Sequence, residues 1–329
     1  MPPRSTTRRA AALALAALCA APLAPAAWAA DAAWPAKPIR LIVPYPPGGS
    51  SDIIARSISQ QLSQALQQPV IVENKPGANG NLGADMVAKS APDGYTWLLC
   101  DLGALAISPS VYTRLPFDPS KDLRGATMLA YSPHMLVVHP SVPAGNLKEL
   151  VALSHRQDLN FAVTATGSAP HLAGVELARL TGAQWVYVPY KGGVQSVQDT
   201  VAGQTQVLMN GMLATYPQVQ AGKLKLLGIS KATRMPLIAD VPTLAEQGAK
   251  GFESGTWQGV VLPAKTPEAV VQRIQQALVA AIRTPDVRAR LTSQGAEVVT
   301  MTPAETDRFF AAERARWLQV VQAAQVKLD

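Results

Sequence analysis

The chain has 329 residues, a formal charge of +7 and only 16% charged residues. This length is enough for two domains with a sizeable core. Lysine and arginine are scattered and aromatic residues are few, whereas nucleic-acid-binding proteins usually cluster basic side chains with aromatic ones. The composition therefore argues against a nucleic-acid partner.

Residues 1–30 are predicted to form a signal peptide. Three arginines precede an apolar run over residues 10–21, and small residues at positions 27 and 29 suit a signal peptidase. The apolar run is too short to span a bilayer. We expect cleavage near Ala29 or Ala30 and export to the periplasm.

Cleavage changes two properties of the chain. The formal charge falls from +7 to +4, a mild bias toward anions. Cys100 becomes the only cysteine, so the mature chain cannot form an intramolecular disulfide and must rely on its core.

The first motif of the mature chain is a loop between a predicted strand, 39–43, and a predicted helix. The loop reads Pro-Tyr-Pro-Pro-Gly-Gly-Ser-Ser over 44–51, and apolar residues then recur every four positions from Ile54 to Leu66. Glycines let backbone N–H groups approach a ligand, and a helix N-terminus attracts an anion. Ser50, Ser51 or Asp52 could equally cap the helix, and capping and binding can coexist.

Two further features follow in the first third. A turn with glycines at 77, 80 and 83 leads into a helix, but this spacing is not the dinucleotide-binding fingerprint, so we interpret the turn as structural packing. A strand over 95–100 then ends at Asp101. Loops at the carboxyl ends of parallel strands line ligand crevices, so Asp101 is either a helix cap or a ligand contact.

The second half repeats the strand–loop–helix pattern. A strand over 160–163 leads through a Thr- and Ser-rich loop, 164–168, into a helix that begins near His171. Hydroxyl groups and free N–H groups make this a second candidate anion site, which could face the first across a cleft. Further strands are predicted at 135–138, 185–188, 206–209, 224–229 and 256–262, with helices after Pro267 and over 303–324. This alternation predicts an α/β fold with mostly parallel sheets.

The sequence offers no sign of catalysis. The four histidines form no metal-spaced pair, Cys100 has no thiol partner, and a Gly-x-Ser-x-Gly nucleophile motif does not occur. We therefore expect no enzyme, no metal site and no cofactor.

Taken together, the motifs resemble the periplasmic receptors of tripartite tricarboxylate transporters, often called Bug receptors. The resemblance covers nearly the whole mature chain, and it lies in the order of the motifs rather than in any one of them. These motifs are Trp34-Pro35, Pro44–Asp52, Glu73–Ala78 with Gly80 and Gly83, Ala91–Thr96, Leu115–Pro119, His171-Leu172 with Glu176, Val188–Gly192, Asp240–Thr243, and Trp257 with Gly259.

The resemblance implies a type II periplasmic-binding-protein fold. Such a protein has two doubly wound α/β domains with a ligand cleft between them, and its chain crosses twice between the domains. We expect domain 1 to contain residues 31–133 plus 253–329, and domain 2 to contain 134–252.

The resemblance also implies a ligand site for a small carboxylate, reached by one loop from each domain and often through ordered waters. Asp52 is expected to cap the first helix more than to touch the ligand. The candidate ligand-binding residues are Tyr45, Pro47, Gly48, Gly49, Ser50, Asp52, Asp101, Thr164, Thr166, Gly167, Ser168, His171 and Asn210.

Three departures from the family pattern bear on the ligand. Val163-Thr164-Ala165 replaces the usual Ser-Pro-Gly, Asn210-Gly211 replaces Asp-Asn or Asp-Ser, and Asp101 stands where a small neutral residue is usual. An added carboxylate repels a dicarboxylate and favours a ligand with a positive or hydrogen-donating group. We therefore expect a monocarboxylate, an amino-acid-like acid or an aromatic acid rather than a citrate-like one.

These expectations define the predicted function. The protein is expected to be a monomeric periplasmic receptor that closes around a small organic acid and docks on membrane permease subunits. The alternative keeps the binding site but passes the signal to a sensor kinase ectodomain. An exported enzyme on the same fold is the third possibility, and it lacks a nucleophile–base pair.

Overall fold

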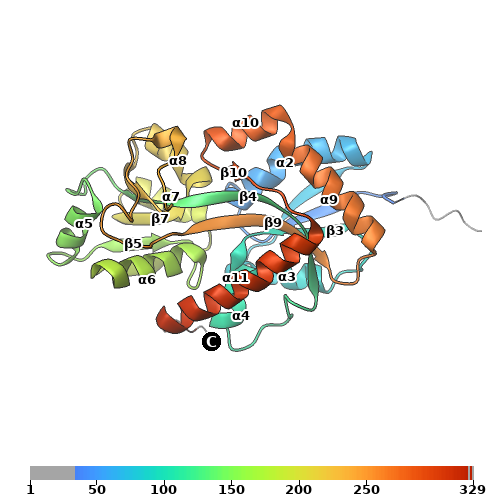
Figure 1. Cartoon of the computed structure of the whole chain (residues 1–329), viewed down its shortest axis with the longest axis horizontal. Coiled ribbons are helices and arrows are strands. Elements are labelled where there is room, and N and C mark those ends of the chain that lie inside the picture. Colours follow the sequence, from blue (N-terminus) through green and yellow to red (C-terminus); the bar gives the residue numbers. More distant parts are fainter. Residues whose placement is uncertain (1–33, 325–326, 328–329) are drawn as a thin grey trace, which may run out of the picture. The chain divides into compact units, whose positions relative to one another are not determined.

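The computed structural model describes residues 34–324 and 327. From Lys37 onward the described chain forms one compact unit (Figure 1). The predicted signal peptide lies outside the described residues.

Strands and helices alternate along most of this unit. The strands are β1 (Ile39–Val43), β2 (Val70–Asn74), β3 (Thr96–Cys100), β4 (Leu123–Val138), β5 (Asn160–Val163), β6 (Val186–Pro189), β7 (Val207–Gly211), β8 (Lys225–Ile229), β9 (Gly255–Pro263) and β10 (Glu297–Val298). The α-helices are α2 (Ser50–Leu66), α3 (Asn81–Ala88), α4 (Ser108–Val111), α5 (Leu147–Ser154), α6 (Ala169–Thr181), α7 (Gly193–Val201), α8 (Met212–Gln220), α9 (Glu268–Arg283), α10 (Pro285–Ser293) and α11 (Pro303–Ala324). Short turns of helix lie at η1 (Ala78–Gly80), η2 (Gly103–Ile107, π-helical) and η3 (Pro236–Ile238).

The strands join in the order β2-β1-β3-β9-β4-β7-β5-β6, with β8 and β10 also paired to β4. Strands β1, β2 and β3 run parallel at one end, and β5, β6 and β7 run parallel at the other. Every pairing of β4 and β9 is antiparallel. The α/β class is confirmed, and the antiparallel centre makes the arrangement more mixed than the mostly parallel sheets that we predicted.

Strand β4 connects the two ends, as Figure 1 shows. Its first part, from Leu123 to Pro133, pairs with β9, and its last part, from His134 to Val138, pairs with β7 and β8. The sequence predicted only residues 135–138 as strand. The sequence does not indicate the earlier part of β4 as strand, because glycine and proline, at Gly125 and Pro133, are rare within strands.

The crossing point of β4 is fixed by a buried polar cluster. The His134 ring bonds to the Ser254 hydroxyl at 3.0 Å and to the Thr256 hydroxyl at 2.9 Å. Burial lowers the pKa of His134 to about 3, so the ring is neutral at physiological pH. These bonds tie β4 to the start of β9, where the chain returns to the first set of strands.

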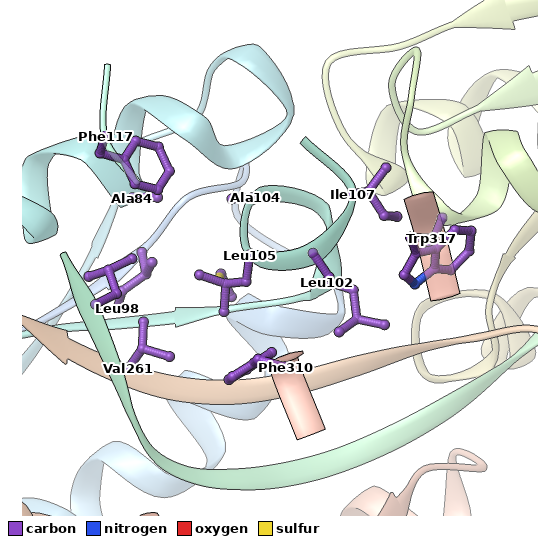
Figure 2. Close-up of a cluster of buried hydrophobic side chains, with 14 of the residues drawn as sticks. Ala84, Leu98, Leu102, Ala104, Leu105, Ile107, Phe117, Val261, Phe310 and Trp317 are labelled. Carbon is purple, nitrogen blue, oxygen red and sulfur yellow. The ribbon is translucent and has the colours of Figure 1, made fainter. Parts of the chain in front are cut away.

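Each end of the sheet has its own apolar core. On the β1–β3 side, one apolar cluster contains Leu98, Leu105, Val261, Phe310 and Trp317, the last two of which lie on α11 (Figure 2). On the β5–β7 side, Leu136, Phe161 and Leu177 belong to a second cluster. The expected domain boundaries at 133/134 and 252/253 stay a prediction.

Candidate functional site

A small cavity of about 50 Å³ lies among loops from both ends of the sheet. Seven of the predicted site residues line it, and they come from four separate loops or strand ends. These residues are Tyr45, Gly49, Ser50, Asp101, Thr164, Ser168 and Asn210. The structure therefore brings together residues that are up to 165 positions apart in the sequence.

Four helices begin at the cavity. Gly49 and Ser50 belong to the start of α2, Ser168 and Ala169 to the start of α6, Gly193 is the first residue of α7, and Ala214 lies in the first turn of α8. The N-cap residues of α2, α7 and α8 are glycines and offer no capping side chain. Ser168 caps α6 through the His171 N–H, and at the start of α8 the Leu213 N–H donates to the Ser132 hydroxyl. Free N–H groups and the positive ends of helix dipoles favour an anion here.

Another part of the wall carries a carboxyl group. Asp101 Oδ1 accepts hydrogen bonds from the Tyr45 hydroxyl at 2.6 Å and from the Gly103 N–H at 2.7 Å. Burial raises the pKa of Asp101 above its usual value, and the two hydrogen bonds partly oppose this rise. Asp101 is the one Asp, Glu, His, Lys or Arg among the residues that line the cavity.

Two amide side chains bring unpaired polar atoms to the same cavity. Gln258, on β9, is fully buried, and within the described structure neither of its amide atoms has a hydrogen-bond partner. Asn79 Oδ1 is also buried without a described partner. Native proteins rarely leave such groups unsatisfied, so these atoms are suited to contact a ligand or ordered water.

A second, wider cavity of about 700 Å³ shares Tyr45, Pro46, Asn79 and Thr164 with the first. Its remaining wall is largely aromatic or apolar, with Tyr112 and Tyr190 among the lining residues and Lys191 beside them. A polar inner cavity thus adjoins a more apolar outer one.

Loops from the two ends of the sheet touch across the cavity. The Asn79 amide donates to the Gly167 carbonyl at 3.3 Å. A Cβ at Gly192 would lie 2.7 Å from Pro46 Cδ, and one at Gly48 would lie 3.3 Å from Val194. The Pro46–Gly49 loop therefore packs directly against the start of α7.

The other predicted site residues lie elsewhere. Thr166 lines the outer cavity, whereas Pro47, Gly48, Asp52, Gly167 and His171 line neither cavity. His171 Nδ1 accepts from the Gly167 N–H at 3.0 Å, and burial lowers the pKa of this histidine to about 4. His171 thus shapes the β5–α6 turn as a neutral ring.

Asp52 holds the loop before α2 in place rather than lining either cavity. Its carboxylate accepts from the Gly48 N–H at 2.8 Å, from Arg56 Nε at 3.0 Å and from the Asn74 amide at 2.9 Å. Burial alone would raise the pKa of Asp52, but these bonds outweigh it and hold the pKa below its usual value. Asp52 fixes the Pro46–Gly49 loop and does not cap the free N–H groups of the α2 first turn, since the α2 N-cap is Gly49.

Nine residues that line the cavity were not among the predicted site residues: Pro46, Ser51, Asn79, Ala169, Pro170, Gly193, Ala214, Thr256 and Gln258. Asn79 lies in the glycine-rich turn that we interpreted as packing, and this turn does pack tightly, since a Cβ at Gly83 would lie 2.7 Å from Pro44 Cβ. The φ of Asn79 is 54°, in the left-handed region that asparagine enters more readily than most other non-glycine residues. Gln258 sits in a strand with no local signal except its polarity among apolar neighbours.

Neither a metal site nor a membrane span appears in the described part of the chain. No group of three or more His, Cys, Asp or Glu side chains is placed to hold a metal ion there. No helix within residues 34–324 is long and apolar enough to cross a membrane.

Comparison with known proteins assigns the family. The model of the tripartite tricarboxylate transporter family receptor matches residues 54–326. The chain belongs to this family. It is also 36% identical to BugT of Bordetella pertussis over 299 residues, which cover 90% of this chain and 91% of that protein.

Solved structures agree with this assignment. Rpa4515 of R. palustris with adipate is 31% identical, with a TM-score of 0.86 and coverage of 89% of this chain and 99% of that one. MatC from Rhodopseudomonas palustris with bound malate is 32% identical, with a TM-score of 0.82 and coverage of 88% and 100%. The fold is therefore that of the two-domain periplasmic binding proteins, and the family consists of binding receptors rather than enzymes.

Proposed function

We propose that this protein is a periplasmic receptor that captures a small carboxylate and delivers it to a tripartite tricarboxylate-type transporter. One observation carries the proposal: four helix N-termini meet at a small polar cavity that is bounded by loops from both ends of the sheet. Backbone N–H groups at helix N-termini bind anions well, and the relatives Rpa4515 and MatC hold adipate and malate.

In this proposal the ligand is held between two domains, residues 31–133 plus 253–329 and residues 134–252. The Pro46–Gly49 loop and α2 serve from the first domain, and the 164–168 loop, α7 and α8 serve from the second. The loop contacts at Asn79–Gly167 and Pro46–Gly192 support a closed arrangement around the cavity. Closure of two domains around a ligand is a common switching motion.

The binding step is tested with the chain from residue 31 onward, purified and freed of bound solutes. Native mass spectrometry before this step reveals any co-purified acid, and a thermal-shift screen then covers mono- and dicarboxylates, including adipate and malate. A matching acid at 100 times its Kd adds about 2.7 kcal/mol of stability, so we expect a melting temperature about 5 °C higher. The absence of a shift with every carboxylate would contradict the proposal.

A matched pair of variants locates the site. Ser50→Ala changes the wall of the inner cavity, whereas Ser59→Ala, on the same helix, removes an exposed hydroxyl that bonds only to the Arg56 carbonyl. We expect the first variant to weaken carboxylate binding several-fold and the second to leave binding unchanged. Equal effects of both variants would place the ligand elsewhere.

Delivery is tested in cells. Deleting the gene should abolish uptake of the radiolabelled ligand, and restoring the wild-type chain should recover it. Normal uptake with a lost transcriptional response to the ligand would instead favour the sensor kinase as the partner.

A further inference from the structure

Part of the inner cavity wall offers hydrogen-bond acceptors. Asp101 Oδ1 is occupied by the Tyr45 hydroxyl and the Gly103 N–H, both of which fix the carboxyl group in place. The orientation of the Asn79 amide is also fixed, because its Nδ2 donates to the Gly167 carbonyl, which can only accept. The unpaired Asn79 Oδ1 is therefore a second acceptor at this cavity.

Gln258 completes this group. In the antiparallel pairing of β3 and β9, Cys100 lies opposite Gly259, so the same register carried one residue further places Asp101 beside Gln258. Gln258 is fully buried, and neither of its amide atoms has a described partner. A buried polar group without a partner is unfavourable, so a ligand that satisfies the amide gains affinity.

These groups discriminate between kinds of ligand. A second carboxylate on the ligand could accept a bond from Gln258 Nε2, but it would meet the oxygens of Asp101 and Asn79, which also accept. An ammonium group donates three hydrogen bonds and neutralises the Asp101 carboxylate in a site where the surrounding dielectric is low.

We propose that the ligand is an ammonium carboxylate, with its carboxylate at the helix N-termini and its ammonium group at Asp101, Asn79 and Gln258. The inference rests on the proposed function, because it assumes that the same cavity binds the carboxylate. Asp101 and Gln258 are then the residues that select the ligand, and the remainder of the ligand extends toward the outer cavity.

The wild-type protein tests this selection directly. Isothermal titration calorimetry is run on matched acids with and without the ammonium group: glutamate and glutarate, norvaline and pentanoate, 4-aminobutyrate and butyrate, and phenylalanine and 3-phenylpropionate. We expect the best ammonium acid to bind at least about tenfold more tightly than its partner.

Variants then assign the preference to the two residues. Asp101→Asn keeps the shape of the side chain and should reduce the preference for the ammonium acid at least about tenfold. Gln258→Leu should weaken the same ligand while changing the affinity of the deaminated acid less. Asp93→Asn is the control, because Asp93 is half-exposed and bonds to Lys37 on the surface. Circular dichroism melting curves verify that each variant folds.

The outcomes separate the two proposals. If the deaminated acids bind the wild-type protein as tightly as the ammonium acids, the ammonium proposal fails while the carboxylate receptor stands. If neither kind of acid binds, the proposed function fails and the ammonium proposal fails with it. A preference that survives unchanged in Asp101→Asn would also overturn the role of this carboxyl group.

Discussion

The side-chain amide of Asn79 donates to the Gly167 carbonyl oxygen at 3.3 Å, joining the glycine-rich turn of η1 to the turn between β5 and α6. The two residues lie 88 positions apart and belong to opposite ends of the sheet. In the proposed receptor, this bond forms only when the two domains are closed around the ligand.

Asn79→Ala should therefore weaken ligand binding. The change removes the bond to Gly167, worth about 1 kcal/mol, together with any ligand contact of Asn79 Oδ1, so the Kd should rise at least roughly fivefold by calorimetry. Asn79→Asp keeps the shape but places an acceptor opposite the Gly167 carbonyl, so a larger loss is expected. Unchanged affinity in both variants would show that this bond plays no part in closure.

Gly192→Ala should affect closure more than folding. The φ of Gly192 is extended, so alanine fits the backbone, but its Cβ would lie 2.7 Å from Pro46 Cδ. We expect about a tenfold loss of ligand affinity with little change in the melting temperature of the ligand-free protein. Small-angle X-ray scattering with ligand should show a less compact variant.

Gly182→Ala is the matched control, which should lower folding stability without affecting ligand binding. Gly182 has a left-handed φ of 76° at the end of α6, and a Cβ there would meet nothing within 4 Å. The alanine should cost about 1 kcal/mol of folding stability and leave the Kd unchanged. If Gly182→Ala weakened binding as much as Gly192→Ala, the steric explanation for Gly192 would be wrong.

Asp101→Asn should stabilise the ligand-free protein at neutral pH. Burial raises the pKa of Asp101 in the folded state above its value in the unfolded state. As pH rises from the unfolded-state pKa to the folded-state pKa, the unfolded chain loses its proton first, so the folded state becomes relatively less stable. The asparagine variant does not lose stability in this way, because its side chain does not ionise. Chemical unfolding at pH 4 and pH 7 should show the advantage of the variant growing toward pH 7.

Tyr45→Phe should destabilise the ligand-free protein near neutral pH, in contrast to Asp101→Asn. It removes the 2.6 Å bond that favours the ionised Asp101, so the pKa of Asp101 should rise further and the stability near pH 7 should fall. The same pH series measures this effect. A pH dependence identical to that of the wild type would show that the Tyr45 hydroxyl does not control this carboxyl group.

Asp52→Ala should destabilise the loop before α2. Three neighbouring groups would lose a charged acceptor, so we expect the free energy of unfolding at pH 7 to fall by about 1–3 kcal/mol. Because the folded-state pKa of Asp52 is lowered, its stabilisation is present above the usual aspartate pKa and is lost as pH falls through the lowered value. The difference between variant and wild type should shrink in strong acid.

The sequence predicted local structure better than side-chain placement. The loop from Pro44 to Ser51, the helix over 303–324 and the Thr- and Ser-rich turn all leave local patterns of glycine, proline or helical periodicity. Strand β4 does not, because its first half gains its stability from β9, a segment more than a hundred residues later.

The same limit applies to the site. Tyr45, Ser50 and Thr164 follow strand ends, where a parallel sheet collects its loops. Gln258 lies within a strand, and the pairing of β9 with β3 brings that strand to the end of β3, directly before Asp101. Such a neighbour depends on tertiary pairing, so no local pattern could reveal it.

Strand β9 lies between β3 and β4 and belongs to the last quarter of the chain. His134 and Thr256, which are bonded at this seam, are 122 residues apart. The first four strands therefore cannot complete their sheet until more than 250 residues have left the ribosome, because loop closure over such a distance must come first. Completion of the sheet is therefore a late step in synthesis, and the edges of β3 and β4 stay without their central partner until β9 follows.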